Sequence, residues 1–318
     1  MSATKKLLPE SEQKRKWLSV LYTAVVAWLL CLCIIYTSKQ YGVALFILTP
    51  LFIGAFSTFI YGYQRTITRR QAVQNGFLAI ALFKAGLFHL AIEGLICIVM
   101  AAPFGILLTW AGSLIGYALI EKTPKNSPTI ILLLIVSIPT TAFIEKDTSP
   151  ELTSVVTSIE ISADAQTVWK NVIEFPQLSE PTEFIFKTGI AYPINAHIEG
   201  TGVGSIRHCN FTTGSFVEPV TIWDEPKLLK FDVVQQPAPM KELSFWNIDA
   251  PHLHDYFVST KGQFKLTALA NGHTLLEGTT WYYHDIKPAF YWQLWSDHIV
   301  HKIHERVLKH IKITSEKK

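Results

Sequence analysis

PAFYWQLWSDHIVHKIHERVLKHIKI, residues 288–313, is the stretch that decides the fold of this chain. Apolar residues recur in it at steps of three and four, at Trp292, Trp295, Ile299, Ile303, Val307 and Ile311. This spacing puts them on one face of a helix, so the sequence predicts a long amphipathic helix here. Pro288 suits its start, and Lys309 and Lys312 suit its end. A helix with one apolar face needs a partner surface.

The segment from about Leu152 to Asp285 has the pattern of short strands, and it is the expected partner surface. β-Branched and aromatic residues alternate with polar ones, and turn residues such as Asn271-Gly272 separate the runs. Strands joined by short turns form an antiparallel sheet, whose apolar face one long helix covers. The expected strands are 152–162, 194–200, 203–211, 215–224, 228–234, 260–270 and 274–284.

A short amphipathic helix is predicted between the first two strands. Asp164 is a suitable N-cap for DAQTVWKNVIEF, and Pro176 ends the helix. A second short helix is expected near residues 181–187. The fold class that follows is α+β: a curved antiparallel sheet around a long C-terminal helix, with a cavity between the two.

The first 145 residues have the composition of a membrane region. Hydrophobic residues make up 49% of the 318-residue chain and charged residues only 17%, and the apolar ones are concentrated before residue 145. We expect a helical transmembrane domain over residues 1–150 and a soluble domain over 151–318. Four to five spans are predicted, over residues 17–37, 42–63, 77–101, 104–120 and 129–144.

Basic residues predict the orientation of these spans. Lys5, Lys6, Lys14, Arg15 and Lys16 precede the first span, Arg65, Arg69 and Arg70 follow the second, and Lys122 and Lys125 follow the fourth. This bias places the N-terminus in the cytoplasm, as in an integral protein of a bacterial inner membrane. Five spans make the C-terminal domain extracytoplasmic. If the fifth span, which contains Pro139, does not cross, that domain is cytoplasmic.

Three ionisable residues, Lys84, His89 and Glu93, lie in the third expected span. His89 and Glu93 are four residues apart and share a face if the helix is continuous. Ionisable groups at membrane depth indicate a functional site such as a proton relay. Alternatively, His89 and Glu93 pair with each other while Lys84 reaches toward the membrane surface.

Several classes of function find no support in the sequence. The net charge of +3 and the absence of a basic stripe with interleaved aromatics argue against nucleic-acid binding. The four cysteines form no CxxC pair and imply no disulfide framework. Catalytic and nucleotide-binding motifs such as HExxH, GxSxG and the phosphate loop are missing, and no cofactor is expected.

Residues 152–313 resemble START-like domains of the polyketide cyclase/dehydrase (SRPBCC) type. The resemblance rests on SIEISADAQTVWKNVIEFPQL, GTGVGSIRHCNF, FVEPVTIWDEPKLLKFDV and KGQFKLTALANGHTLLEGTTWYYH, followed by the terminal helix. It implies a helix-grip fold with a cavity for an apolar or amphipathic molecule. Such domains include lipid carriers, receptors and cyclases, so the resemblance indicates fold more than function.

Candidate ligand-binding residues follow from the expected faces of the strands and the last helix. A buried Arg207 would either hold a ligand or pair with Glu218 or Glu277. The long insertion 235–258 is expected to gate the cavity or to be a self-packed loop. The predicted site residues are Arg207, Glu277, Trp281, Tyr283, Trp295 and His298, with His252 and His254 on the insertion. Asp297, His301 and His304 form a weaker candidate metal site.

Three functions remain open at this point. The first is a membrane-anchored binding protein for a lipid or another hydrophobic small molecule, with membrane lipids as its other partners. The second is an enzyme of cyclase, dehydrase or hydrolase type that uses histidines and carboxylates of the same cavity. The third is a protein-interaction module with no ligand.

Overall fold

The computed structural model describes residues 8–122, 127–146 and 148–317. These residues form two compact units. The first comprises the helices that precede Thr148 together with the segments Ser244–Pro251 and Ile286–Pro288, and the second comprises the rest of the chain from Ser149. The two later segments thus group with the N-terminal helices, although they follow the boundary expected at residue 150. Lys5, Lys6 and Lys125, used above for orientation, lie outside the described residues.

The first unit is helical. Four of its segments are long and apolar enough to cross a membrane, namely Glu12–Ser38, Ala44–Gly62, Ala102–Lys122 and Ser127–Glu145. In chain order its elements are α1 (Glu12–Cys33), η1 (Ile34–Ser38), η2 (Ala44–Leu48), α2 (Thr49–Gly62), α3 (Arg69–His89), α4 (Leu95–Met100), α5 (Ala102–Lys122) and α6 (Ser127–Glu145).

The predicted continuous span 77–101 is wrong, because a break divides it. Helix α3 ends at His89, Ala91 adopts a positive φ of 55°, and α4 begins at Leu95 behind the N-cap Gly94. Apolar residues continue through the break, so hydropathy alone did not reveal it. The predicted shared helix face of His89 and Glu93 is wrong for the same reason. The ring nitrogen Nδ1 of His89 instead lies 2.7 Å from the carbonyl oxygen of Ala85.

Helices α2 and α5 run parallel and touch through glycines. A β-carbon on Gly112 would lie 2.2 Å from the carbonyl oxygen of Leu51, and one on Gly116 would lie 2.6 Å from that of Ala55. Small residues at such positions let two helix backbones approach closely. At these contacts the residue numbers of the two helices rise in the same direction, so α2 and α5 are parallel.

Helix α3 runs antiparallel to α5. A β-carbon on Gly76 would lie 2.1 Å from Ser113 Oγ, whereas one on Gly105 would lie 3.6 Å from Lys84 Nζ. Later residues of α3 therefore meet earlier residues of α5. Since α2 and α5 are parallel, α3 carries the chain back along the length of the bundle between them.

The remaining two long helices run in the same direction as α3. Asn75 Nδ2 donates to Ser19 Oγ at 2.9 Å and Trp28 Nε1 donates to the carbonyl oxygen of Phe83 at 2.9 Å, so α1 and α3 are parallel. The carboxylate at the end of α6, Glu145, accepts hydrogen bonds from two backbone N–H groups at the start of η2, at 2.9 and 3.3 Å. Five helices thus alternate in direction along the bundle.

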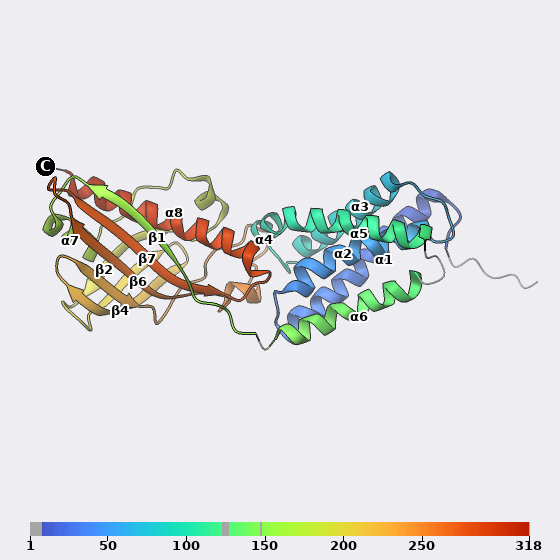
Figure 1. Ribbon diagram of the computed structural model, residues 1–318, viewed down its shortest axis with the longest axis horizontal. Coiled ribbons are helices and arrows are strands. Elements are labelled where there is room, and N and C mark those ends of the chain that lie inside the picture. Colours follow the sequence, from blue (N-terminus) through green and yellow to red (C-terminus); the bar gives the residue numbers. More distant parts are fainter. Residues whose placement is uncertain (1–7, 123–126, 147, 318) are drawn as a thin grey trace, which may run out of the picture. The chain divides into compact units, whose positions relative to one another are not determined.

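The second unit contains one antiparallel sheet of seven strands in the order β1-β7-β6-β5-β4-β3-β2 (Figure 1). Turn residues end the strands as predicted, and Gly272 of the β6–β7 hairpin has a φ of 79°, which a glycine adopts without strain. The strands are β1 (Thr153–Ile161), β2 (Pro193–Glu199), β3 (Ile206–Phe211), β4 (Gly214–Asp224), β5 (Leu228–Asp232), β6 (Phe257–Ala268) and β7 (Thr274–His284).

Helices cover the concave face of this sheet. Asp164 caps α7 (Ala165–Ile173) as predicted, and its carboxylate accepts from the backbone N–H of Thr167 at 3.0 Å. The second expected short helix is the 3₁₀ helix η3 (Phe184–Thr188), and a 3₁₀ turn, η4 (Pro251–Leu253), precedes β6. The long terminal helix is α8 (Ala289–Ser315), which lies along β1 and β7 (Figure 1).

The core lies between α8, α7 and the sheet. Trp169 of α7, Leu229 of β5 and Leu276 of β7 are fully buried there. On α8 the buried apolar residues are Trp292, Val300, Val307, Leu308 and Ile311, while Trp295, Ile299 and Ile303 of the predicted stripe are partly buried. A curved antiparallel sheet that grips a C-terminal helix is the helix-grip fold, so the predicted fold class is confirmed.

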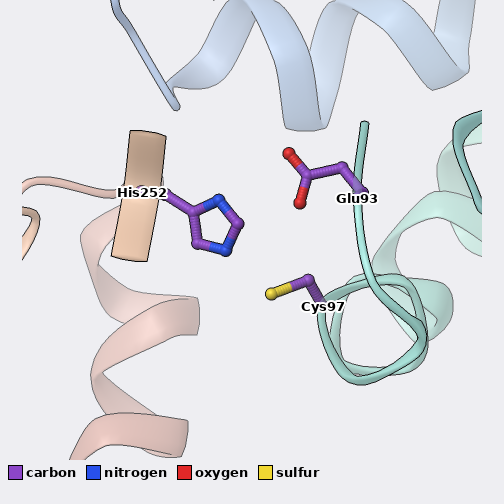
Figure 2. A group of neighbouring side chains, drawn as sticks. All are labelled: Glu93, Cys97 and His252. Carbon is purple, nitrogen blue, oxygen red and sulfur yellow. The ribbon is translucent and has the colours of Figure 1, made fainter. Parts of the chain in front are cut away.

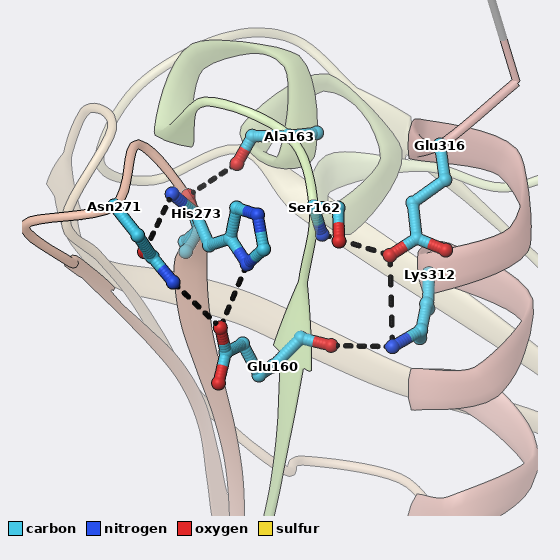
Figure 3. A network of polar contacts seen from close by, with 8 residues as sticks. Glu160, Ser162, Ala163, Asn271, His273, Lys312 and Glu316 are labelled. Carbon is cyan, nitrogen blue, oxygen red and sulfur yellow. Dashed lines mark hydrogen bonds and ion pairs between the residues drawn. The ribbon is translucent and has the colours of Figure 1, made fainter.

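Polar contacts fix the C-terminal end of α8 to the sheet (Figure 3). Lys312 Nζ donates to the carbonyl oxygen of Glu160 at 2.7 Å, and the backbone N–H of Ser162 donates to the carboxylate of Glu316 at 2.8 Å. The side chain of Glu160 in turn contacts His273 Nδ1 at 2.7 Å. These bonds join α8, β1 and the β6–β7 hairpin, so the helix end cannot swing away without breaking them.

Candidate ligand-binding cavity

A cavity of about 120 Å³ lies between the concave face of the sheet and α8. Its wall is mostly apolar: Phe211, Phe216, Phe231, Phe257 and Phe264 line it from the strands, and Val300, Ile303, Val307 and Leu308 line it from α8. Its polar wall includes Arg207, Glu218, Thr280 and His304. Lys261 also lines the cavity and is exposed, so the cavity reaches the surface near this residue.

Small residues create this space. A β-carbon on Gly278 would lie 3.7 Å from the side chain of Leu308, so a larger side chain there would fill the gap between β7 and α8. A β-carbon on Gly262 would lie 2.4 Å from the ring of Phe231, so only glycine lets that ring lie across β6. The cavity therefore depends on Gly278, where β7 presents no side chain toward Leu308 of α8.

A buried ion pair forms one wall of the cavity. Arg207 on β3 and Glu218 on β4 are direct partners in the strand register, and Arg207 Nη1 donates to Glu218 Oε2. The two residues are 2% and 6% exposed. The guanidinium carbon of Arg207 also lies 5.2 to 5.8 Å from the ring centres of Phe175, Phe231 and Phe264, within the range of cation–π attraction. The sequence-based alternative of an Arg207–Glu218 pair is thus observed.

Burial sets the protonation of this pair. Burial alone lowers the pKa of Arg207, but the adjacent Glu218 carboxylate and, to a smaller extent, Cys209 together outweigh this and raise that pKa above its ordinary value. Burial raises the pKa of Glu218, against the opposing effect of Arg207. Arg207 Nε, which is buried, has no hydrogen-bond partner among the described residues. The guanidinium, which also interacts with the Cys209 thiol, therefore has one buried donor without a nitrogen or oxygen partner among the described residues.

His304 bridges α8 to two strands. Its Nε2 lies 2.7 Å from Thr280 Oγ1 on β7, and its Nδ1 lies 3.1 Å from Thr157 Oγ1 on β1. Burial, with a smaller contribution from nearby His301, lowers the pKa of His304 to about 4. The imidazole is therefore neutral near pH 7, and both of its nitrogens are engaged by hydroxyl groups.

The weaker candidate metal site is not supported by this arrangement. Both nitrogens of His304 have hydroxyl partners, and His301 contacts Thr157 through Nδ1 at 2.8 Å and Glu305 through Nε2 at 3.2 Å. Asp297 instead accepts a hydrogen bond from Tyr282 at 2.5 Å. Among the described residues, Asp297, His301 and His304 do not converge on one point.

The predicted inward face of β7 is wrong. Thr280 bonds His304, and a side chain at Gly278 would meet Leu308, so even-numbered residues of β7 face α8. Glu277, Trp281 and Tyr283 lie on the opposite face. There Glu277 pairs with Lys265 at 3.3 Å, and Lys230 Nζ lies 5.2 Å from the ring of Trp281.

The other predicted site residues are also absent from the cavity wall. Trp295 is partly buried and His298 is exposed, and both lie on the N-terminal half of α8. His252 (Figure 2) is buried within the 3₁₀ turn η4, while His254 is exposed directly after it. Of the eight residues predicted to bind a ligand, Arg207 alone lines this cavity.

Sequence reasoning did not single out Cys209 or the two glycines as site residues. Cys209 follows Arg207 by two on β3, so it faces the same way and lines the cavity. Burial raises the pKa of its thiol to about 12, so the thiol stays protonated and unreactive. An alternation of Arg207, Cys209 and Phe211 was visible in the sequence and identified this face of β3.

In the helical unit, the two polar residues around the break after α3 are Glu93 and Cys97 (Figure 2). Glu93 is buried in the break, and Cys97 lies in the first turn of α4. Lys84 lies nine residues before Glu93, within α3, next to Gly105 of α5. The three ionisable residues of the predicted span therefore do not lie on one continuous helix, because Lys84 and His89 belong to α3 and Glu93 lies in the break after it.

No protein-family model and no curated protein matches the sequence. Norcoclaurine synthase from Thalictrum flavum, solved in complex with dopamine and hydroxybenzaldehyde, is similar over 54% of this chain and 91% of its own, with 15% identity and a TM-score of 0.34. A protein from Bacillus thuringiensis is similar over 52% of this chain and 100% of its own, with 14% identity and a TM-score of 0.33. A protein from Nitrosospira multiformis is similar over 51% of this chain and 94% of its own, with 15% identity and a TM-score of 0.32.

Proposed function

We propose that this chain is a membrane-anchored binding protein whose helix-grip domain holds a small, uncharged, largely apolar molecule. The observation that carries the proposal is the cavity under α8, which has an aromatic wall and one buried donor, Arg207 Nε, without a partner. Concave apolar sites with few polar groups are the usual form of small-molecule sites in proteins.

The volume limits the size of the guest. An apolar protein cavity of about 150 Å³ holds one benzene ring, and pockets for drug-sized ligands measure about 300 Å³ or more. At about 120 Å³, the cavity fits a group of the size of one aromatic ring. A membrane lipid would have to leave most of its length outside, so we propose a compact hydrophobic molecule in place of an intact lipid.

The charges limit the chemistry of the guest. Arg207 and Glu218 neutralise each other, so a charged guest would place an unpaired charge among phenylalanine rings at a high cost. A carbonyl or ether oxygen would accept a hydrogen bond from Arg207 Nε without adding charge. The proposed ligand class is therefore an uncharged, ring-sized molecule with an oxygen acceptor.

Catalysis has less support than binding. His304 is the imidazole of the cavity wall, and both of its nitrogens are held by Thr157 and Thr280, so it is not placed to move a proton to a guest. Cys209 is a protonated thiol. A pure interaction module has less support as well, because the space under α8 is not packed solid.

The proposed membrane placement rests on the bundle. Its five long helices alternate in direction, and Arg15, Lys16, Arg65, Arg69, Arg70 and Lys122 gather where α1 and α3 begin and α2 and α5 end. The opposite end carries Lys39 and Lys146. By the positive-inside rule the first end is cytoplasmic, and the chain leaves the bundle on the outer side. A C-terminal alkaline phosphatase fusion should be active in a bacterial host, and a fluorescent fusion there should be dark.

The binding proposal is tested with acetophenone, a ring with an oxygen acceptor, and ethylbenzene, its apolar counterpart. Ligand-observed NMR on the full chain in detergent should detect both, with acetophenone binding more tightly. Gly278→Leu, which fills the cavity, should abolish the signal from both probes. Glu277→Leu, one position away on the outer face of β7, is the matched control and should bind both normally.

Native mass spectrometry of the detergent-extracted chain is the second test, because it looks for a small molecule retained from the host. A mass retained by Glu277→Leu and lost from Gly278→Leu would identify the natural guest. Equal binding of both probes by the two variants, or no binding by the wild type, would refute the proposal.

A further inference from the structure

Two histidines and a glutamate meet on the hairpin of β2 and β3, away from the cavity. His197 and His208 are direct partners in the strand register, and their rings stack with centroids 5.0 Å apart and an interplanar angle of 15°. Glu199 Oε1 lies 3.7 Å from His208 Nε2. One ligand atom from each of the three residues lies within 4.8 Å of the other two.

This cluster faces outward. His208 stands between Arg207 and Cys209, which line the cavity, so its side chain points to the other face of β3. His197 and Glu199 are exposed and His208 is partly exposed. An ion from solution can therefore reach all three side chains without any opening of the domain.

The spacing follows from strand geometry. His197 and Glu199 are two residues apart on β2, so they share a face, and His208 is the cross-strand neighbour of His197. Zinc binds imidazole nitrogen at about 2.0–2.1 Å and carboxylate oxygen at about 2.0–2.2 Å, so tetrahedral ligands of one ion lie about 3.4 Å apart. Side-chain rotations alone can bring the three donor atoms from their present separation to that distance.

We propose that His197, Glu199 and His208 form a surface site for a divalent transition-metal ion, with Zn²⁺ as the expected occupant. Two imidazoles and one carboxylate are a ligand set that zinc takes in proteins, with a fourth position left for water or another ligand. The site is separate from the cavity and does not depend on the proposed ligand.

An ordinary surface ion pair explains less of this arrangement. A pairing of Glu199 with His208 needs no second histidine, yet His197 stacks directly on His208 and has no hydrogen-bond partner among the described residues. The chain provides a comparison in His273, which contacts Glu160 at 2.7 Å and has no second histidine beside it. One histidine and one carboxylate make a pair, whereas the β2–β3 cluster provides three donors.

A bound ion would have a structural effect as well. β2 is an edge strand of the sheet, and its inner face adjoins Arg207 through the partner position Ile198. A metal held by both strands would tie this edge to β3. Zinc should therefore slow amide hydrogen exchange in β2 more than in β7.

The experiment is isothermal titration calorimetry, in which ZnCl₂ is added to the full chain in detergent. The chain is produced without a polyhistidine tag and is freed of metal with EDTA before the titration. The wild type should bind one more zinc ion than the variants His197→Ala and His208→Ala, or bind it at least about tenfold more tightly. Glu199→Gln should weaken binding. His273→Ala is the matched control and should behave like the wild type.

Counting zinc by difference separates this site from any other histidine or cysteine in the chain. His197, Glu199 and His208 are partly or fully exposed, so their variants should unfold at the same temperature as the wild type in EDTA, and His273→Ala, which loses its contact with Glu160, should unfold within a few degrees of it. Zinc stoichiometry and affinity that are unchanged in both histidine variants would overturn the proposal. A wild type that takes up no zinc would overturn it too.

Discussion

Glu218→Gln is expected to destabilise the β3–β4 hairpin strongly, because it removes one charge of a buried pair and nearly keeps its shape. Arg207 is 2% exposed, so its guanidinium would remain charged without a counterion. Breaking a buried ion pair by removing one partner costs about 3–5 kcal/mol. At about 1.4 kcal/mol for each factor of ten, local opening should become roughly 140- to 3700-fold more frequent.

The double variant Arg207→Met/Glu218→Leu should recover most of this loss. Replacing a buried pair by apolar residues of similar volume is often neutral or stabilising. The phenylalanine rings that now surround the guanidinium would pack against the methionine instead. The single variants Arg207→Met and Glu218→Leu, this double variant and the wild type form a double-mutant cycle, whose coupling energy should be about 3 kcal/mol or more.

Hydrogen exchange with mass spectrometry on the full chain measures these effects locally. Peptides that cover β3 and β4 should exchange faster in Glu218→Gln, while peptides from α1 serve as the internal reference. Lys265→Gln is the matched control, because it breaks the exposed pair with Glu277, which is worth about 0–1 kcal/mol. If Glu218→Gln exchanges no faster than Lys265→Gln, or if the double variant is worse than either single one, the buried pair does not act as argued.

Three further outcomes are expected. His304 has a pKa of about 4 in the folded chain and about 6.5 when unfolded. The free energy of unfolding of the wild type, measured with urea, should therefore fall by about 2.6 kcal/mol as pH drops from 6.5 to 4, and His304→Gln should lack this part of the pH dependence. Gly262→Ala should lower the unfolding temperature by several degrees, at a cost of about 1–3 kcal/mol, because its β-carbon would lie 2.4 Å from the ring of Phe231. Gly278→Ala, whose nearest contact would be at 3.7 Å, should change the unfolding temperature little. Gly112→Val should make the helical bundle aggregate at a lower temperature in detergent, since a β-carbon there meets a carbonyl oxygen of α2 at 2.2 Å, while Ile115→Val on the exposed side of α5 should not.

The strands and α8 were predictable from sequence because their signals are local. Turn residues mark where strands must end, and the Asn271-Gly272 pair forms the β6–β7 hairpin with Gly272 at positive φ. The stripe of α8 is a property of spacing within one helix, and Trp292, Val307 and Ile311 of that stripe are buried. Neither inference requires knowledge of which strands lie next to one another.

The inward face of β7 was not predictable in the same way. Both faces of this strand carry apolar or aromatic residues, and Trp281 and Tyr283 suggested the wrong side, although Tyr282 between them is the buried one. The register decides the question, because Phe231 pairs with Gly262 and Gly262 pairs with Thr280, so these three share the inner face. Assigning the inner face one residue out of step places every side chain of the strand on the wrong side. Glu277, Trp281 and Tyr283 were therefore all wrongly assigned to the site.

The cavity itself depends on positions with small or absent side chains, and hydrophobic patterns in a sequence do not reveal such positions. Gly278 is a weak strand former and Thr280 is small, yet the two leave the room under α8 that larger residues would fill. Arg207 was identified because a charge within an apolar strand needs a partner. Gly262 and Gly278 could have been identified in a similar way, because a glycine inside a strand often indicates that another group approaches the backbone closely.

The proposed orientation of the chain depends on α3 more than on α6, although α6 contains Pro139. Helix α6 has 19 residues and is apolar enough to cross a membrane, whereas α3, with Arg69, Arg70 and Lys84, is not among the segments selected by hydropathy. However, α2 and α5 point the same way, and the chain joins the end of one to the start of the other. Since α3 runs antiparallel beside both, it carries the chain back along the bundle, and the number of passes along the bundle is odd. A chain that enters the bundle at its basic end therefore leaves it at the opposite end, and this supports our proposal that the domain from Ser149 onward is extracytoplasmic.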